Sequence, residues 1–293
     1  MGNKRKSVAY LRFLIREELV SAKCMAILLT MLTLCTIIFY PITLHIIHEN
    51  AMSGYWEMLG TLLGSHWFYE CCLLGGILLI SGIPYMGKEV PYYLVRGKKK
   101  DWVLGNVWFL VITAILFYGM IALFTLFFLL PGITFQNEWS SVYEELSEGV
   151  SDFSVKAGNW LLFQDLSDIN FNANPLDFAG WLILLSVLSL VVMGMLILFF
   201  SVIGKKKVGI AIVVLMIVLD GAVAVLENME GMKFATVFNF LNPISFIKSA
   251  WIPSESLKQV GNQMYGLLFD VVVIVLLALG SFWKMKKTDW MSE

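Results

Sequence analysis

Six long apolar stretches, separated by polar segments, dominate the hydrophobic pattern of the chain. Each approaches or exceeds about 20 apolar residues, the length that an α-helix needs to cross the hydrocarbon core of a bilayer. We therefore predict an all-α integral membrane protein with six transmembrane helices, in which residues 1–293 form a single transmembrane domain. The second stretch is the weakest. The predicted spans cover residues 24–46, 67–87, 103–130, 180–203, 208–226 and 264–283.

A shorter amphipathic segment precedes the first span. Between residues 4 and 22, apolar side chains recur at helical spacing, and the charged side chains lie off this stripe. The pattern predicts an amphipathic N-terminal helix lying along the inner surface of the membrane. Such a helix either docks a cytoplasmic partner or anchors the chain to anionic lipid, and the stripe alone favours neither role. The stripe comprises Val8, Leu11, Leu14, Ile15 and Leu19.

Two segments between the spans are also expected to fold. Residues 48–66 carry aromatic and leucine side chains at a spacing typical of a short amphipathic helix at the outer membrane surface. Residues 131–179 are acidic but include Trp139, Trp160 and Phe163. Because such aromatic side chains gain from burial, we predict a small helical extracellular cap here rather than a free linker.

Composition agrees with a membrane protein and argues against several other classes. Hydrophobic residues make up 58% of the chain and charged residues 15%, whereas a typical soluble domain has about 25% charged residues. The four cysteines include no CxxC pair, so neither a disulfide scaffold nor a zinc site is expected. The net charge of −1 points to no nucleic-acid partner.

The distribution of basic residues predicts the orientation of the spans. Seventeen of the 21 Lys and Arg residues lie up to the start of the first span, in the 88–102 loop, in the 204–207 turn or after the sixth span. The positive-inside rule assigns all four of these segments to the cytoplasm. Six spans return the chain to the side on which it started, so both termini are expected in the cytoplasm.

Two acidic residues, Asp220 and Asp270, lie well inside predicted spans. Each is about six residues from the outer end of its helix, or roughly 9 Å below the outer surface. An unpaired carboxylate at such depth costs about 2.5–3.5 kcal/mol on insertion scales. None of the six predicted spans contains a lysine or arginine that could offset this cost. Either these residues line a substrate or ion pathway, or they are neutral acids hydrogen-bonded within the bundle.

Other candidate chemistry is sparse. Residues 82–89 resemble a phosphate-binding P-loop, but Glu89 replaces the Ser or Thr that would hold magnesium, and no strand precedes the segment. The chain is therefore not expected to be an enzyme that hydrolyses ATP by itself. His45 and His48 are three residues apart and are either interfacial side chains or half of a metal site, with the first favoured.

The 88–102 loop is the most distinctive polar segment, because it combines basic residues with Pro91, Tyr92, Tyr93 and Leu94. Its lysines need no explanation beyond a solvated cytoplasmic loop. The aromatic and apolar side chains are explained either by a docked soluble partner or by burial at the lipid headgroups.

The order of these features resembles the permease subunits of bacterial type-2 ATP-binding-cassette (ABC) exporters. Such permeases have an amphipathic N-terminal helix, six spans, and a short basic loop with a coupling helix between the second and third spans. Their loop motif, of the form sR-x-x-x-W-x-x-G-K, is matched loosely by Arg96, Trp102 and Gly105, with Asn106 in place of the usual lysine.

A second feature of that family is an L-N-P turn between the fifth and sixth spans, followed by an aromatic residue. Here the corresponding residues are Leu241, Asn242, Pro243 and Phe246. In the family this region forms short re-entrant helices at the outer face. The chain departs from the family in its large outer loop, which follows the third span rather than the first or the fifth.

The resemblance implies that two permeases, identical or paralogous, form a dimer that works by alternating access. A separate ATPase subunit would dock on the N-terminal helix and the 88–102 loop and would carry the ATP and Mg²⁺, so no cofactor is expected in this chain. Asp220 and Asp270 would lie near the outer gate. The protein would reside in the bacterial cell membrane and export a peptide, lipid or other amphipathic substrate. The docking residues would be Glu89, Tyr92, Tyr93, Arg96, Lys98, Lys99 and Lys100.

Two other functions remain open at the level of sequence. The chain could be a non-transporting immunity or sensor subunit that binds a peptide at its acidic outer face. It could also be an ion-coupled secondary transporter using Asp220 and Asp270, although we find no inverted repeat of the kind common in such transporters.

Overall fold

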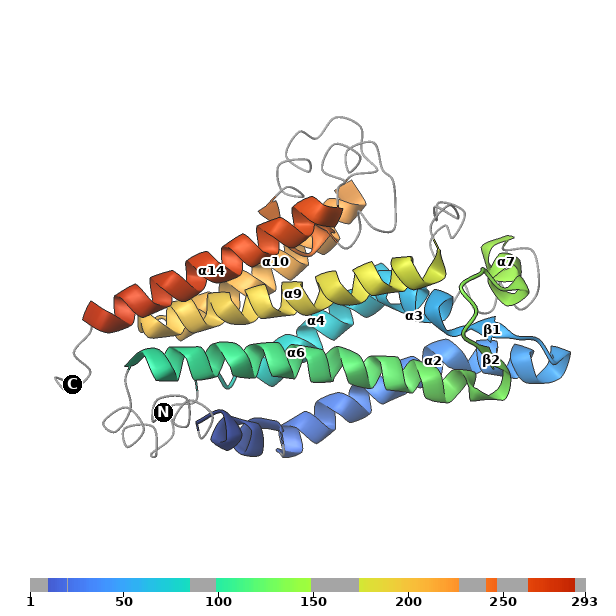
Figure 1. Cartoon of the computed structure of the whole chain (residues 1–293), viewed down its shortest axis with the longest axis horizontal. Coiled ribbons are helices and arrows are strands. Elements are labelled where there is room, and N and C mark those ends of the chain that lie inside the picture. Colours follow the sequence, from blue (N-terminus) through green and yellow to red (C-terminus); the bar gives the residue numbers. More distant parts are fainter. Residues whose placement is uncertain are drawn as a thin grey trace.

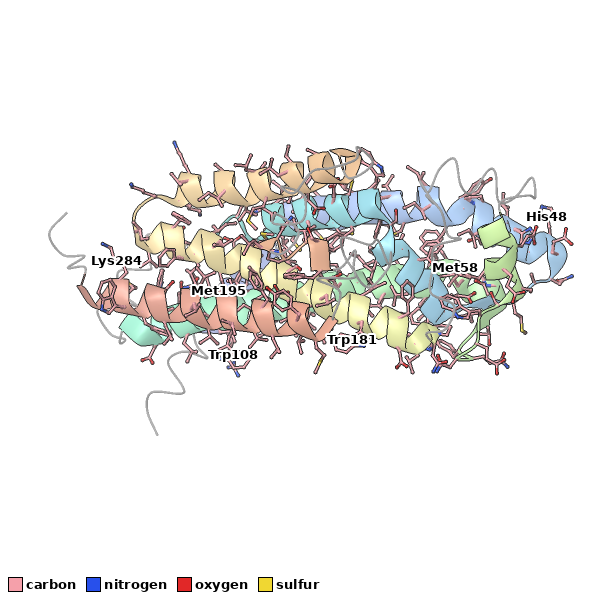
Figure 2. The ribbon with its side chains drawn as sticks, turned by 90° about the horizontal axis from the view of Figure 1, so that it is seen from above. His48, Met58, Trp108, Trp181, Met195 and Lys284 are labelled. Carbon is pink, nitrogen blue, oxygen red and sulfur yellow. The ribbon has the colours of Figure 1, made fainter. Side chains whose placement is uncertain are left out.

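A computed structural model of the chain describes residues 10–19, 21–84, 99–148, 174–226, 241–246 and 263–287, and these are mostly helical. The long helices run roughly along one axis (Figure 1). The 10–19 segment and the last turns of α14 (Gln263–Lys287) lie at one end of the molecule, whereas α7 (Ser141–Glu148) lies at the other. Figure 2 likewise shows His48 and Lys284 at opposite ends of the bundle.

Four helices are long and apolar enough to cross a membrane: α2 (Ala22–Glu49), α6 (Lys99–Leu129), α9 (Pro175–Val202) and α14. They match the first, third, fourth and sixth predicted spans. A fifth crossing results if α3 (Tyr55–Gly64) and α4 (His66–Ile80), which meet at 76°, form one broken span. Helix α10 (Lys206–Leu226) occupies the range predicted for the fifth span. A membrane protein is thus supported, while the count of six spans stays a prediction.

The ends of the helices use the expected capping residues. Ser21 precedes α2, and its hydroxyl accepts a hydrogen bond from the Cys24 amide at 3.2 Å. The same helix ends at Asn50, which adopts a left-handed conformation with φ of 51°. Helix α9 begins with Pro175, whose missing N–H would have no partner within the helix in any case. Between such ends, the helices satisfy their own backbone groups, as a hydrocarbon environment requires.

Helix α9 forms the centre of the bundle. It packs against α14, α3, α10 and α6. Of its most apolar 18-residue stretch, 67% is buried, compared with 17% for the corresponding stretch of α14. Helices α9 and α10 form a tight hairpin in which Gly204 has a φ of +83°, a conformation that favours glycine. At Gly209 a Cβ atom would lie 3.2 Å from the Ile197 Cα, so glycine permits this close approach of the two helices.

The end of the bundle around α7 is closed by short elements. Strand β1 (Ser53–Gly54) pairs in parallel with β2 (Ile133–Thr134), next to the short helix η2 (Leu130–Gly132). Glu57 of α3 accepts hydrogen bonds from the Gly54 amide at 2.8 Å, and from the amide and hydroxyl of Ser140. The predicted cap over 131–179 therefore contains ordered elements up to α7, and α9 begins within the predicted range. Residues 149–173 lie outside the described part of the chain.

The helix expected in residues 48–66 is present as α3, but its expected position at the surface is wrong. Eight of its ten residues are buried, so nearly every face of the helix contacts protein. The physical reason is the long apolar helix α9, against which α3 packs. The leucines that suggested a membrane-facing stripe, Leu59, Leu62 and Leu63, are instead each 1% exposed.

Part of the N-terminal helix is also described. Residues 10–14 are α-helical and continue into a π-helical turn, η1 (Ile15–Leu19). Tyr10 and Leu14, at 3% and 0% exposure, are buried against the bundle. The helical conformation is thus confirmed for these residues. A position along the membrane surface stays a prediction.

Candidate functional site

The two acids predicted inside spans both lie in a buried polar cluster, which we call the acid cluster: Tyr69 on α4, Ser189 on α9, Asp220 on α10, Asn242 and Ser245, and Asp270 on α14. Both Asp side chains belong to residues with 0% exposure. The Tyr69 hydroxyl interacts electrostatically with both carboxyl groups. One tyrosine thus links two acids that are 50 residues apart in the sequence.

Asp220 is held by the segment that carries the predicted outer turn. Its Oδ1 atom accepts hydrogen bonds from Asn242 Nδ2 at 3.1 Å and from the Ser245 hydroxyl at 3.0 Å. Two separate predictions, an acid in the fifth span and an Asn-Pro turn after it, therefore meet at one site.

The turn itself is inserted into the bundle. Residues 242–246 are buried, and the Pro243 carbonyl accepts a hydrogen bond from the Ser189 hydroxyl of α9 at 3.1 Å. On the other side, the Phe246 ring packs edge-on against Phe269 and Tyr265 of α14, with centroids 5.2 and 5.6 Å away. The turn therefore fills the space between α10 and α14. Its position relative to a membrane surface stays a prediction.

Asp270 differs from Asp220 in its hydrogen bonding. Neither of its carboxyl oxygens bonds another group in the part of the chain that the structure describes. It lies one residue beyond Phe269 and one helical turn beyond Gly266, against which Phe246 packs. The turn thus contacts α14 directly beside Asp270.

Several members of the acid cluster were not anticipated from the sequence, namely Tyr69, Ser189 and Ser245. The hydroxyls of Tyr118 on α6 and Ser186 on α9 extend it, since Tyr118 interacts with both Tyr69 and Ser186. A signal was available, because Ser186 and Ser189 are three residues apart and so share one face of α9. Paired hydroxyls on one face of an apolar helix indicate a polar contact within the bundle.

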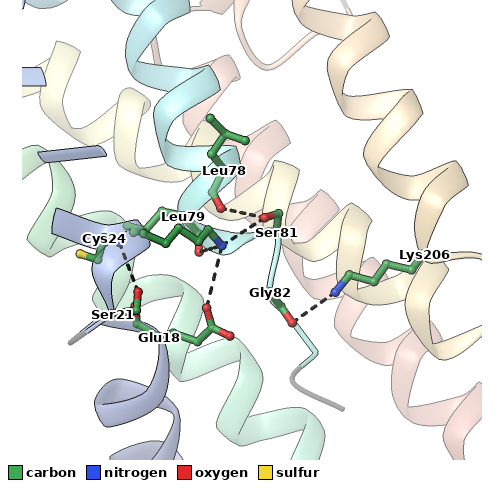
Figure 3. A network of polar contacts seen from close by, with 9 residues as sticks. Glu18, Ser21, Cys24, Leu78, Leu79, Ser81, Gly82 and Lys206 are labelled. Atoms are coloured by element: carbon green, nitrogen blue, oxygen red, sulfur yellow. Dashed lines mark hydrogen bonds and ion pairs between the residues drawn. The ribbon is translucent and has the colours of Figure 1, made fainter. Parts of the chain in front are cut away.

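A second polar cluster lies where α4 ends, and we call it the basal cluster (Figure 3). Lys23 of α2 donates hydrogen bonds to the Leu79 carbonyl at 3.3 Å and the Ser81 hydroxyl at 3.2 Å, and its Nζ lies 3.9 Å from Glu18 Oε2. Lys206 of α10 donates to the Gly82 carbonyl at 3.2 Å. Burial lowers the Lys206 pKa below its ordinary value, while Glu18 acts in the opposite direction.

The basal cluster surrounds the point where α4 ends and the predicted docking loop begins. A Cβ at Gly82 would collide with the Glu18 carboxylate, so the N-terminal segment contacts one flank of the loop. On the other flank, a Cβ at Gly105 of α6 would lie 2.7 Å from the Tyr10 ring. The short N-terminal segment therefore contacts the helices on both sides of residues 88–102.

Of the predicted docking residues, only Lys99 and Lys100 lie in the described part of the chain. Lys99 and Lys100 form the first turn of α6. Trp102, named in the family motif, is buried at 4% exposure, and its carbonyl accepts a hydrogen bond from Asn106 Nδ2 at 2.9 Å. The remaining predicted docking residues lie outside the described part of the chain: Glu89, Tyr92, Tyr93, Arg96 and Lys98.

His45 has a structural partner at the α7 end of the bundle. Its Nε2 lies 3.3 Å from Glu145 Oε2, which ties α2 to α7. Among the described residues there is no group of three His, Cys, Asp or Glu side chains arranged to hold a metal ion. The four cysteines, all described, are free thiols.

Comparison with known proteins gave no match: neither a family model, nor a curated protein, nor a solved structure is significantly similar to the chain.

Proposed function

We propose that the chain is the membrane-spanning permease subunit of an ABC exporter in a bacterial cell membrane. In this proposal a separate ATPase subunit hydrolyses ATP, and two permeases, identical or paralogous, form the transport path. Six transmembrane helices with both termini in the cytoplasm belong to the same proposal. The cargo is an amphipathic molecule such as a peptide or a lipid.

The observation that carries this proposal is the contact of one N-terminal segment with both flanks of the 88–102 loop. Glu18 contacts Gly82 at the end of α4, and Tyr10 contacts Gly105 near the start of α6. Lys23 and Lys206 link the same region to α2 and α10. A partner bound to the loop and the N-terminal segment would therefore push on four helices at once, as a coupling device must.

The acid cluster supports the transport part of the proposal. Polar groups buried between apolar helices are costly, and they commonly line a substrate or ion path. In this chain they gather where the inserted turn contacts three different helices. Movement of the turn would uncover the acids, which suits a gate that opens as the helices separate.

Co-purification with an ATP-binding-cassette subunit encoded next to this chain tests the proposal. Charge reversal at Arg96, Lys98, Lys99 and Lys100 is expected to abolish assembly and permease-stimulated ATP hydrolysis. The matched control is charge reversal at Lys205 and Lys207, which are exposed and lie outside the 88–102 loop. Undiminished assembly after reversal in the loop would exclude it as the docking site.

Reconstitution distinguishes the proposed exporter from an ion-coupled transporter. An exporter needs the ATPase and ATP to move its cargo in liposomes. Transport driven by a proton gradient, without any ATPase, would contradict the proposed function.

A further inference from the structure

We infer that Asp270 is the anionic centre of a binding site for a primary ammonium group carried on an apolar molecule. This inference rests on the proposed function and specifies its substrate class: an amphipathic amine.

Asp270 is 0% exposed, and both of its oxygens lack hydrogen-bond partners among the described residues. Asp220, by contrast, is bonded to Asn242 and Ser245. A buried, ionised carboxylate needs a counter-charge or donors, because desolvation without them is expensive. Of the two acids, Asp270 is therefore the one equipped to receive a ligand.

Neither of the described salt bridges involves Asp270. The described salt bridges, Lys23 with Glu18 and His45 with Glu145, both lie towards the ends of helices and away from the acid cluster. Between its ends, no predicted span carries a lysine or arginine. Since none of the described residues supplies a positive charge beside Asp270, we assign that charge to a bound molecule.

An ammonium group fits the surroundings of Asp270 better than a divalent metal ion does. A divalent metal would need three or more anionic or imidazole ligands, and the described residues offer no such group. An ammonium group needs hydrogen-bond acceptors for its three N–H donors. The two Asp270 oxygens supply two acceptors. The hydroxyl of Tyr69, which interacts electrostatically with Asp270, supplies a third.

The surroundings of the site suit an apolar tail on that ammonium group. The rings of Phe246, Phe269 and Tyr265 gather beside Asp270, with centroids 5.2–6.1 Å apart. Aromatic faces attract cations as well as apolar chains. Leu268 and Val271, on either side along α14, are exposed apolar side chains at 60% and 43%, so hydrocarbon can lie close to the site.

Binding of n-decylammonium to the purified chain in phosphatidylcholine nanodiscs tests the inference. We expect saturable binding above the level of empty nanodiscs, and a loss of about tenfold or more in Asp270→Asn. Asp270→Glu should retain part of the affinity, because it keeps the charge. Asp177→Asn, an equal charge change at an exposed position on α9, is the matched control and should bind like the wild type.

Two further probes separate charge from hydrogen bonding. n-Decyltrimethylammonium has the same charge and tail but no N–H donor, and n-decanol has no charge. Both should bind at least about tenfold more weakly than n-decylammonium. Equal binding of all three probes, or equal binding by Asp270→Asn, would overturn the inference. Equal binding of the two cations would overturn the role of the N–H donors.

Folding and the source of the amine are controlled within the same experiment. Asp270→Asn removes a buried carboxyl group that has no hydrogen-bond partner among the described residues, so its melting temperature without ligand should equal or exceed that of the wild type. Phosphatidylethanolamine added to the nanodiscs should compete with n-decylammonium if the natural amine is a lipid headgroup, and should not compete if it is a soluble amphiphile. None of these measurements involves the ATPase, so a failed ABC assembly and a failed amine site remain distinguishable.

Discussion

At the scale of single residues, the polar groups buried in this apolar bundle differ sharply in how well they are satisfied. Asp220 has two hydrogen-bond donors from the inserted turn, whereas Asp270 has none among the described residues. Both acids nevertheless come from similar depths in their sequences, about six residues from a helix end. Burial alone therefore does not define a binding site, and the distribution of donors around the two carboxylates does.

Asp220→Ala is expected to destabilise the protein by about 1–3 kcal/mol, because it leaves the Asn242 amide and the Ser245 hydroxyl without their acceptor. The measurement is equilibrium unfolding of the purified protein in mixed detergent. Asp220→Asn is the control, since its carbonyl oxygen still accepts from both donors, and it should lose less. Equal losses in the two variants would contradict a role of these bonds in holding the turn.

Lys206 predicts a pH dependence of stability. Burial lowers the pKa of this amine in the folded protein below its ordinary value of 10.5. Between the two pKa values the unfolded chain binds more protons than the folded one, so stability rises with pH in that window. As the pH is raised to about 10, the melting temperature of the wild type should therefore increase relative to that of Lys206→Met.

The control for Lys206 is its neighbour Lys205, which is exposed. Lys205→Met should follow the wild-type pH profile, because the Lys205 side chain is exposed to solvent in the folded chain. If Lys206→Met also kept the wild-type profile, the buried position of its amine would be excluded as the cause.

At the scale of elements, the α9–α10 hairpin depends on close contact between two helix backbones. At Gly209 a side-chain carbon would lie 2.8 Å from Phe200 Cβ and 3.2 Å from Ile197 Cα, neither of which can move without shifting α9. Gly209→Val is expected to cost about 1–3 kcal/mol by overpacking. Gly119→Val on α6 is the matched control, since no atom lies within 4 Å of its Cβ position.

The Gly209 comparison is read from unfolding midpoints of the two variants. Both replacements make the same change in backbone freedom, so only the packing differs. A Gly209→Val protein as stable as Gly119→Val would show that α9 and α10 are further apart than the structure describes.

Helix positions were predicted well from sequence because apolar length is a local property. Helices α2, α6, α9, α10 and α14 lie where long runs of apolar residues were recognised. The α3–α4 region was harder, because its apolar side chains were divided between an outer surface helix and a span. The burial of α3 depends on its contacts with α9, over 100 residues away in the sequence.

The acid cluster shows the same limit. Asp220 and Asp270 were recognised as candidates because an acid in an apolar run is conspicuous locally. Their link through Tyr69, and the bonds from Asn242 and Ser245 to Asp220, were not visible, because they join four separate segments of the chain. Sequence patterns identify which residues need an explanation, and only packing determines which of them meet.

At the scale of the whole molecule, the number of membrane crossings decides whether the two ends of the bundle face different compartments. If α3 and α4 together form one span, the chain crosses five times between His48 and Lys284, which lie at opposite ends of the bundle (Figure 2). An even number of crossings would instead put both residues on one side of the membrane, which conflicts with their positions at opposite ends of the bundle.

Single cysteines at these two positions measure the difference. With the four native cysteines replaced by alanine, His48→Cys should react with a membrane-impermeant maleimide in intact cells, and Lys284→Cys only after permeabilisation. This outcome follows from six spans with the basic end inside, because seventeen of 21 basic residues then lie in the cytoplasm. Labelling of both cysteines from one side would mean an even number of crossings between them. The predicted six-span topology and the opposite positions of the two residues in the structure would then both be wrong.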